Sequence, residues 1–200
     1  MSPEQPRGRH DFEASYSGTP PWDIGRPQSA FQALADAGDL RGRVLDAGCG
    51  TGEHALMAAR LGLEATGIDA APTAIEIARK KARDRGLEVR FLVGNALDLT
   101  SLGQQFDTVL DCGLFHVFDD NDRAAYVASL SAATAPGSRY FMLCFSERQP
   151  GDSGPRRVTQ DEIRASFQNG WRVDAIEAVM LETNLGPEGV FAWLARITRV

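Results

Sequence analysis

The chain has 200 residues, 43% of them hydrophobic, which suffices for one buried core and is close to the usual size of a single domain. Its formal net charge of −6 provides no broad basic surface, so a small-molecule ligand is favoured over nucleic acid. The three cysteines, Cys49, Cys112 and Cys144, are far apart and indicate neither a disulfide framework nor a zinc site. No segment has the apolar length of a signal peptide core or of a membrane span. We therefore expect a cytoplasmic protein that does not bind membranes.

A single domain is expected over residues 1–200, with an N-terminal tail and lid segment over 1–27 and a catalytic core over 28–200. Residues 1 to about 15 are polar and are predicted to form a tail. The stretch SGTPPWDIGRPQ that follows, residues 17–28, contains three prolines and two glycines, which disfavour a helix or an inner strand. It nevertheless carries Trp22, a large apolar side chain that needs a surface to pack against.

Short apolar runs and amphipathic segments alternate through the core. A helix is predicted first, over residues 28–39, because its apolar residues recur at helical spacing and Gly38 can end it. The next elements are strands at 43–47, 63–68, 89–93, 106–111 and 140–145, and helices at 53–60, 72–84 and 121–134. Pro136 and Gly137 are expected to end the last helix before the fifth strand. This regular alternation predicts a doubly wound, mainly parallel sheet.

The C-terminal part has a different pattern. Thr159 and Glu162 have the spacing of a capping box, which predicts a short helix. Two strands, at 171–181 and 190–198, follow with no helix between them and predict an antiparallel hairpin at the sheet edge. The expected fold class is therefore α/β, with a Rossmann-like sheet of seven strands, mainly parallel, and an antiparallel C-terminal hairpin strand.

The sequence VLDAGCGTGE, residues 44–53, predicts a strand that runs into a glycine-rich turn opening a helix. Such a turn lets the backbone come close to a ligand and leaves helix N-terminal amides free to bind it. A dinucleotide fingerprint requires a glycine at the position of Glu53, and Asp46 would repel a pyrophosphate, so NAD is disfavoured. A ligand with an ammonium group and no phosphate suits Asp46 better. S-adenosylmethionine is such a ligand.

Further polar residues follow the ends of the next two strands. Asp69 stands roughly twenty residues beyond the glycine turn, where a carboxylate can accept hydrogen bonds from both ribose hydroxyls. Asn95 follows the third strand, and its amide can donate to and accept from the edge of an adenine ring. The full set of expected cofactor contacts is Asp46, Gly48, Cys49, Gly50, Asp69, Ala70, Asn95, Ala96, Asp111 and Trp22.

The ordered set VLDAGCGTG, GID, GNALDL and FDTVLDCGLFHVF resembles the class I S-adenosylmethionine-dependent methyltransferases over residues 28–146. The resemblance implies the class I methyltransferase fold and S-adenosylmethionine as cofactor, although Asn95 replaces the aspartate more usual there. PPWDIGRPQ, CGTGEHALMAA, LFHVFDD and CFSERQPGDSGPRRVT are similar to a mycobacterial-type branch that methylates small heterocyclic toxins, including hydroxyquinoline N-oxides and quinols. This implies detoxifying methyl transfer to a hydroxyl or ring nitrogen of a small planar acceptor.

The segment ahead of the first strand can fold over the open carboxyl edge of the sheet, where ligands of doubly wound folds bind. Trp22 would then cover the cofactor or the substrate, and the prolines around it would stiffen the lid. Tyr16 is expected to close the same side and to contact the substrate. The alternative is that Trp22 attaches the tail to the outside of the first helix.

His116 is the candidate general base, because it follows the fourth strand at the carboxyl edge of the sheet. Phe115 and Phe118 are expected to sandwich a flat substrate. The alternative for His116 is a histidine that caps or packs a loop. Methyl transfer needs mainly an aligned nucleophile, so a base is not obligatory. His54 is expected to pack or bond locally, and His10 is assigned no role.

Arg157, with Arg156 before it, is expected to orient an anionic substrate oxygen, although both can equally be ordinary surface charges. Asp119, Asp120 and Asp122 precede a predicted helix and indicate N-capping rather than a metal site, so no metal is expected. The Pro-Pro-aromatic tetrapeptide of nucleic-acid amino methyltransferases is missing after the fourth strand. A thiol or chalcogen methyltransferase, a nicotinamide oxidoreductase and a non-catalytic binding module remain alternatives. The sequence leaves monomer and homodimer open.

Overall fold

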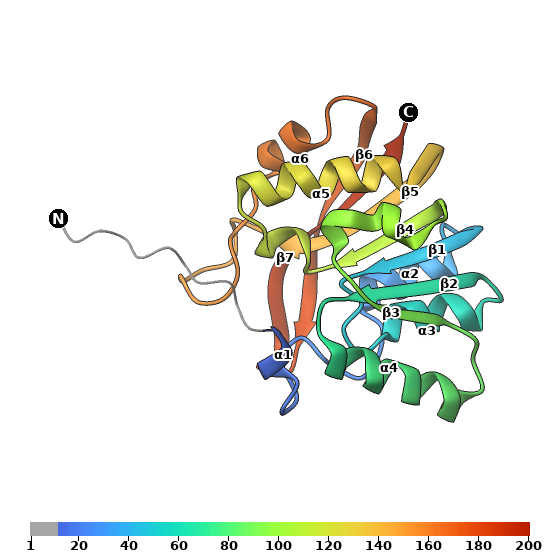
Figure 1. Cartoon of the computed structure of the whole chain (residues 1–200). Coiled ribbons are helices and arrows are strands. Elements are labelled where there is room, and N and C mark those ends of the chain that lie inside the picture. The colour runs from blue at the N-terminus through green and yellow to red at the C-terminus, as the bar shows by residue number, and fades with distance from the viewer. Residues whose placement is uncertain (1–11) are drawn as a thin grey trace.

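A seven-stranded sheet runs through the computed structural model, which describes residues 12–200 (Figure 1). The strands are β1 (Arg43–Ala47), β2 (Glu64–Asp69), β3 (Arg90–Val93), β4 (Phe106–Cys112), β5 (Thr134–Phe145), β6 (Trp171–Thr183) and β7 (Gly186–Arg199). Their order is β3-β2-β1-β4-β5-β7-β6; the first five are parallel, and β7 is antiparallel to both β5 and β6. This confirms the predicted doubly wound sheet with an antiparallel C-terminal hairpin at its edge.

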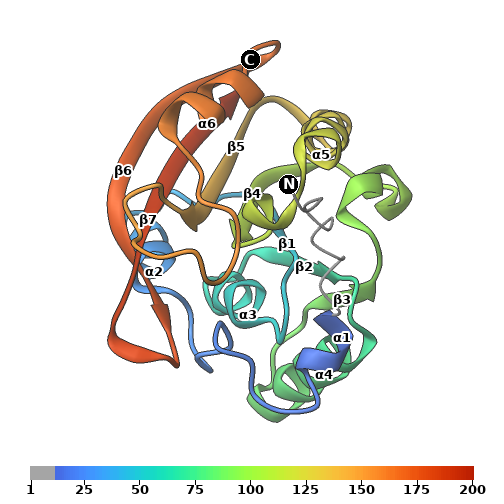
Figure 2. The same cartoon turned by 90° about the vertical axis from the view of Figure 1, so that its left-hand side faces the viewer.

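Helices cover both faces of the sheet (Figure 2). The helical elements are α1 (Phe12–Ser15), α2 (Ser29–Asp36), α3 (Glu53–Arg60), α4 (Pro72–Arg85), the 3-10 helices η1 (Ala96–Leu102) and η2 (Phe115–Val117), α5 (Asp120–Ala132) and α6 (Gln160–Ser166). Apolar side chains of α2, α3 and α4 form one buried cluster with the sheet, and those of η1, α5 and α6 form a second cluster. The core is thus two layers of side chains, one on each face of the sheet.

Local sequence signals explain where several helices begin and end. Pro72 occupies the first turn of α4, and Gly86 ends that helix with a φ of +63°, a backbone conformation that glycine adopts without steric cost. Asp119 caps α5 by accepting a hydrogen bond from the amide of Asp122 at 2.8 Å. Thr159 caps α6 in a full capping box. These agree with the predicted signals.

Strand β5 begins earlier than predicted. Pro136 and Gly137 lie inside the strand range Thr134–Phe145, and α5 already ends at Ala132. The register against β4 shifts here, because Phe106 pairs with Thr134 while Thr108 pairs with Arg139. The hydroxyl of Ser138 spans the irregularity by donating to the carbonyl of Phe106 at 2.9 Å. The proline and glycine are accommodated in this bulge-like irregularity.

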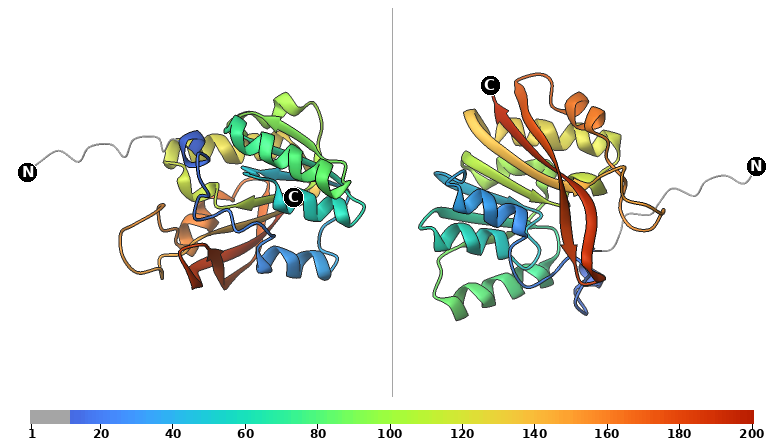
Figure 3. Two further views of the ribbon diagram at one scale, coloured as in Figure 1. Left: turned by 90° about the horizontal axis from the view of Figure 1, so that it is seen from below. Right: turned by 180° about the vertical axis from the view of Figure 1, so that it is seen from behind.

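The hairpin of β6 and β7 extends well beyond the parallel strands and reaches the N-terminal segment (Figure 3). Its turn lies beside the segment between α1 and α2: the amide of Asn184 donates to the carbonyl of Pro21 at 2.8 Å. Arg26 forms an ion pair with Glu182 at 2.8 Å. The hairpin therefore anchors the predicted lid segment, and it does so at the carboxyl edge of the parallel strands.

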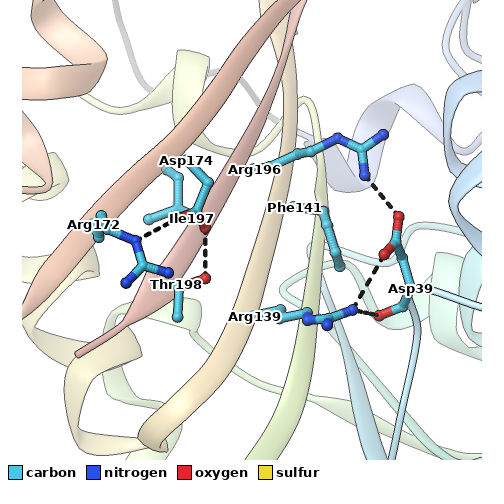
Figure 4. A pocket seen from close by; sticks show the side chains of 8 residues that line it. All are labelled: Asp39, Arg139, Phe141, Arg172, Asp174, Arg196, Ile197 and Thr198. Atoms are coloured by element: carbon cyan, nitrogen blue, oxygen red, sulfur yellow. Dashed lines mark hydrogen bonds and ion pairs between the residues drawn. The ribbon is translucent and has the colours of Figure 1, made fainter.

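A hollow of about 270 Å³ lies at the opposite, amino edge of the sheet, beside the loop after α2 (Figure 4). Its lining is a network of ion pairs. Asp39 accepts from Arg139 at 3.2 Å and from Arg196 at 2.7 Å, and Asp174 accepts from Arg172 at 2.6 Å. Asp39 is shared by two guanidinium groups and Asp174 pairs with the third, so the network joins the loop after α2 to the sheet and leaves none of these arginines without a carboxylate partner.

No helix within residues 12–200 is both long enough and apolar enough to cross a membrane. Residues 1–11, including His10 and most of the predicted tail, lie outside the described part of the chain.

Candidate active site

The glycine turn after β1 lies directly against the end of β2. The amide of Gly50 donates to one carboxylate oxygen of Asp69 at 2.8 Å, and the amide of Ala71 donates to the other at 2.9 Å. Burial raises the pKa of Asp69, while these amides counteract the shift. Gly52 has a φ of +88°, and a Cβ there would lie 2.6 Å from the ring of Phe91, so only glycine fits. The structure thus brings together the glycine turn and Asp69 with its neighbour Ala70.

The end of β3 joins the same group through its backbone. The amide of Gly94 donates to the carbonyl of Asp69 at 2.9 Å. Asn95 caps η1, because its Oδ1 accepts from the amide of Leu97 at 3.0 Å. Ala96 is buried in the core, and its carbonyl accepts from Ser129 at 2.9 Å. The predicted contacts Asn95 and Ala96 therefore lie next to Asp69, but the side-chain oxygen of Asn95 has a structural task.

Asp46 ends β1 beneath the glycine turn and is completely buried. Its Oδ2 accepts a hydrogen bond from the amide of Ala55, in the first turn of α3, at 3.1 Å. Its Oδ1 is buried and has no hydrogen-bond partner among residues 12–200. Burial raises the pKa of Asp46 to about 8, and the charges of Asp69 and Asp111 add to the shift. An unpaired buried carboxylate oxygen is costly, so this atom marks a place where a polar or cationic group fits.

Asp111 lies near the end of the neighbouring strand β4. Its carboxylate is surrounded by hydrogen-bond donors of the protein. Its Oδ1 accepts from the amides of Leu114 at 2.8 Å and Phe115 at 3.3 Å. Its Oδ2 accepts from the hydroxyls of Tyr140 at 2.7 Å and Tyr126 at 3.0 Å. Burial raises its pKa to about 6, and these hydrogen bonds oppose the shift. This carboxylate organises the loop after β4, and the cofactor contact expected of Asp111 stays a prediction.

His116 lies in η2, is buried, and has its ring edge-on to Phe145. Its Nδ1 accepts a hydrogen bond from the amide of Phe145 at 3.0 Å, so the neutral ring carries its proton on Nε2. Burial lowers the pKa of His116 to about 3, with the charges of Arg123 and Arg157 adding to the shift. A histidine in this state offers a hydrogen-bond donor at Nε2, whereas the sequence predicts a general base. The geometry favours the donor.

Of the two phenylalanines expected to sandwich a substrate, Phe115 belongs to the core and Phe118 packs against it, partly buried. Phe115 is fully buried, with the guanidinium of Arg123 over its ring at 4.6 Å. Phe118 packs on Tyr126 with ring centroids 5.1 Å apart. The exposed apolar side chain of this segment is instead Val117, at 37%. The tight turn of η2, which periodicity does not describe, directs Phe115 into the core and leaves Phe118 half-buried, and a substrate contact of these rings stays a prediction.

The segment between α1 and α2, residues 16–28, covers the glycine turn and is called the lid below. Tyr16 is buried against Ala71 and Ala74, and a Cβ at Gly50 would lie 2.9 Å from its hydroxyl oxygen. Burial and the charge of Asp69 raise its pKa. Trp22 is 39% exposed and donates from Nε1 to that hydroxyl at 3.1 Å. Both aromatic residues thus lie over the glycine turn, and Tyr16 is on the predicted cofactor side.

The lid is fastened to the glycine turn by a contact that the sequence analysis missed. The hydroxyl of Thr51 donates to Asp23 at 2.9 Å, and the ammonium of Lys81 on α4 donates to the same hydroxyl oxygen at 2.7 Å. Lys81 and Arg85 also pair with Glu53, at 2.9 and 2.8 Å. No local motif signals this arrangement, because the three segments are separated by about thirty residues each.

Arg157 is committed to its own loop. Its guanidinium donates to the carbonyls of Gln149, Pro150, Gly151, Ser153 and Pro155, and it lies 5.3 Å from the ring centroid of Phe145. These bonds hold the loop 146–158 in shape. Arg157 therefore has a structural task in this loop, and its expected role in orienting a substrate oxygen stays a prediction. Arg156 pairs with Asp120 at 2.5 Å and with Glu162.

The chain was compared with known families and proteins. A family model described as a methyltransferase domain matches residues 44–137. The 2-heptyl-1-hydroxyquinolin-4(1H)-one methyltransferase of Mycobacteroides abscessus is 39% identical over 184 residues, which are 86% of this chain and 81% of that protein. The demethylmenaquinone methyltransferase of Thermus thermophilus is 41% identical over 114 residues, 56% of this chain and 51% of that protein.

Solved structures give the same result. A chain from a study of the conversion of a disulfide bond into a thioacetal group during echinomycin biosynthesis is 40% identical, with a TM-score of 0.86. The match covers 94% of this chain and 91% of that one. Magnesium protoporphyrin IX methyltransferase from Synechocystis, solved with bound S-adenosylhomocysteine, shares the fold at 18% identity, with a TM-score of 0.69 and coverage of 86% and 81%.

The sheet order, the glycine turn and these matches lead to one classification and set aside a nicotinamide oxidoreductase. The chain belongs to the class I methyltransferases, enzymes that take their methyl group from S-adenosylmethionine.

Proposed function

We propose that this enzyme transfers a methyl group from S-adenosylmethionine to a hydroxyl of a small planar aromatic heterocycle of the N-hydroxyquinolinone or quinol type. The observation that carries the proposal is the 39% identity to a hydroxyquinolinone methyltransferase, which extends over 86% of this chain. An identity over so much of the chain extends well beyond the glycine turn and its neighbouring strands.

The residues at the carboxyl edge fit S-adenosylmethionine chemically. Asp69 has carboxylate lone pairs to spare for the two ribose hydroxyls, because each oxygen accepts only one amide bond. The glycine turn lets a ligand come close to the protein backbone. The unpaired Oδ1 of Asp46 suits the ammonium group of the methionine part. Bound there, the cofactor supplies an activated methyl group, and this chain supplies position.

His116 has a defined task in this scheme. With Nδ1 accepting from Phe145, Nε2–H can donate to the acceptor oxygen and align it with the methyl group. An acidic N-hydroxyl ionises easily at neutral pH, so no base is needed to remove its proton. Methylation removes the acidic proton, which is consistent with the detoxification of such a compound. Trp22 and Tyr16 close the cofactor side and exclude water.

The test is turnover with acceptors of matched shape. The enzyme is incubated with S-adenosylmethionine and an N-hydroxyquinolinone, a quinol, the N-unsubstituted quinolinone or an aryl thiol. S-adenosylhomocysteine formation and product mass are then followed. O-methylation of the hydroxylated compounds, at least tenfold faster than reaction of the other two, is expected. Preferential methylation of the thiol would contradict the proposal.

Sulfur is the second candidate acceptor, and one observation favours it. The structure with a TM-score of 0.86 comes from a study of disulfide-to-thioacetal conversion, and its identity to this chain, 40%, equals that of the quinolinone enzyme within one percent. A soft sulfur nucleophile needs no general base, which the buried neutral His116 also permits. A small cyclic peptide disulfide in the same assay distinguishes the two candidates.

A further inference from the structure

His54 is a buried side chain that the proposed chemistry does not use. It is the second residue of α3, immediately after the glycine turn, and its ring packs edge-on against Phe31 with centroids 4.9 Å apart. Its Nε2 accepts a hydrogen bond from the amide of Gln28 at 3.2 Å. The neutral ring therefore carries its proton on Nδ1. Burial lowers the pKa of His54 to about 4, so the ring is neutral near pH 7.

The protonated nitrogen of His54 faces the unpaired atom at the end of β1. Nδ1 is 3.9 Å from Oδ1 of Asp46, the buried carboxylate oxygen without a hydrogen-bond partner in the described chain. That separation is about 1 Å too long for a hydrogen bond, so a small rotation of the ring or the carboxylate would form one. The other oxygen of Asp46 is already held by Ala55, the residue after His54.

The opposite side of the His54 ring connects to the lid. Gln28 is the last residue of the lid, and its side chain pairs with the backbone of Glu182 on β6 through bonds of 2.8 and 3.0 Å. These bonds fix Gln28, which in turn fixes the plane of the His54 ring through its amide. An unbroken series of contacts thus runs from β6 through Gln28 and His54 toward Asp46.

We propose that His54 is a positioning residue: its Nδ1–H orients Asp46 to receive the ammonium group of the cofactor, and its Nε2 links that carboxylate to the end of the lid. The inference rests on the proposed role of Asp46 in cofactor binding. Of the two ring nitrogens of His54, Nε2 is used within the protein, and Nδ1 lies near Oδ1 of Asp46. The donor Nδ1–H faces Oδ1 of Asp46, which accepts no hydrogen bond in the described chain. When a cation pairs with that oxygen, Nδ1–H of His54 can donate to the same oxygen and hold it in place.

The test separates the ammonium end of the ligand from its adenosine end. Binding of S-adenosylhomocysteine and of 5′-methylthioadenosine, which lacks the amino-acid part, is measured by calorimetry for three proteins. These are the wild type, His54→Phe and His54→Asn. Phenylalanine keeps the ring that packs on Phe31 and removes both polar atoms, whereas asparagine retains a donor near the position of Nδ1.

His54→Phe is expected to weaken S-adenosylhomocysteine binding roughly tenfold or more while changing methylthioadenosine binding less than about threefold. His54→Asn is expected to recover most of the lost affinity. In the wild type, the proton resonance of His54 Nδ1–H should move downfield on addition of S-adenosylhomocysteine but not of methylthioadenosine.

Equal losses for both ligands in His54→Phe would show that the residue only supports the fold and would overturn the inference, as would unchanged binding of both. If the wild type bound methylthioadenosine and S-adenosylhomocysteine equally well, the assignment of Asp46 to the ammonium group would fail instead. The two failures are therefore distinguishable.

Discussion

Two buried aspartates stand side by side at the carboxyl edge of the sheet, and their surroundings differ sharply. Asp46 ends β1 and Asp111 lies near the end of β4, where Ala47 and Asp111 are register partners. Both carboxylates are fully buried. Asp111 accepts four hydrogen bonds, whereas Asp46 accepts one and keeps one oxygen unpaired within the described residues. Their pKa values follow this count, being raised to about 6 and about 8.

This difference separates two kinds of site at the carboxyl edge of the sheet, one around Asp111 and one around Asp46. Around Asp111 the protein satisfies its own carboxylate, so the loop that carries His116 is built before any ligand binds. Around Asp46 one buried carboxylate oxygen accepts no hydrogen bond within the described residues, a cost that a bound polar or cationic group can offset. The two side chains lie on opposite faces of the sheet, because Asp46 is the register partner of Leu110 and Asp111 that of Ala47, so each carboxylate meets the donors that its own face supplies.

The largest effect is expected from removing the satisfied carboxylate. Asp111→Ala leaves two tyrosine hydroxyls and two amides without an acceptor and opens a cavity, so the free energy of unfolding should fall by about 3–5 kcal/mol. Asp111→Asn should lose much less, because the amide oxygen still accepts from Leu114 and Phe115. Urea unfolding measures both. Equal losses in the two variants would show that the charge and the Oδ2 acceptor, which both variants remove, determine the effect, and not the cavity or the bonds to Oδ1.

The same change at the neighbouring position should act on binding instead. Asp46→Asn removes the charge proposed to pair with the ammonium group, and S-adenosylhomocysteine affinity should fall roughly 100-fold by calorimetry. Asp111→Asn is the matched control and should change that affinity less than about threefold. If both variants lose affinity to the same extent, the proposed difference between Asp46 and Asp111 in ligand binding is wrong.

A smaller effect is expected from pH. The raised pKa of Asp46, about 8, means that the carboxyl of the free protein is mostly protonated at pH 7 and must ionise to pair with a cation. Affinity should therefore decrease as pH falls below 8, by up to about tenfold per unit, and binding at pH 7 should release up to about one proton. The charges of Asp69 and Asp111 raise the pKa of Asp46, while Asp46 in turn raises the pKa values of Cys49 and Cys112, and His54 lies 3.9 Å away.

Calorimetry of S-adenosylhomocysteine binding in buffers of different ionisation enthalpy measures this proton release. Asp46→Asn should abolish it, and His54 contributes none because its pKa is lowered to about 4. Proton release that persists in Asp46→Asn would assign the titration to another group.

The site around Asp46 at the end of β1 could be predicted from the sequence, because glycine spacing and strand periodicity are local signals. The positions of Asp46, the glycine turn and Asp69 follow from them. The site around Asp111 could not be predicted in this way. Its partners Tyr126 and Tyr140 lie 15 and 29 residues further on, in α5 and β5. A periodicity argument shows that both tyrosines are buried but not which carboxylate they bond.

The same limit applies to the surroundings of the other candidate site residues. In η2, a single 3-10 turn decides that Phe115 points inward while Val117 is exposed, and no apolar repeat is long enough to show it. Arg157 stands in a loop where a surface role and a substrate role look alike in sequence. Its five carbonyl partners are set by the folded conformation of the loop, which the sequence does not reveal.

The smallest expected effect tests the difference between the two aspartates most directly, because it removes the hydrogen-bond donors of Asp111 one at a time. Tyr126→Phe and Tyr140→Phe each remove one hydroxyl from Oδ2 of Asp111 and should each cost about 1 kcal/mol of unfolding free energy. The double variant should cost more than the sum, since Oδ2 then has no donor within the protein, as Oδ1 of Asp46 has none in the described chain. Simple additivity in urea unfolding would mean that water replaces the hydroxyls, and that a missing donor at this edge is not by itself the mark of a ligand site.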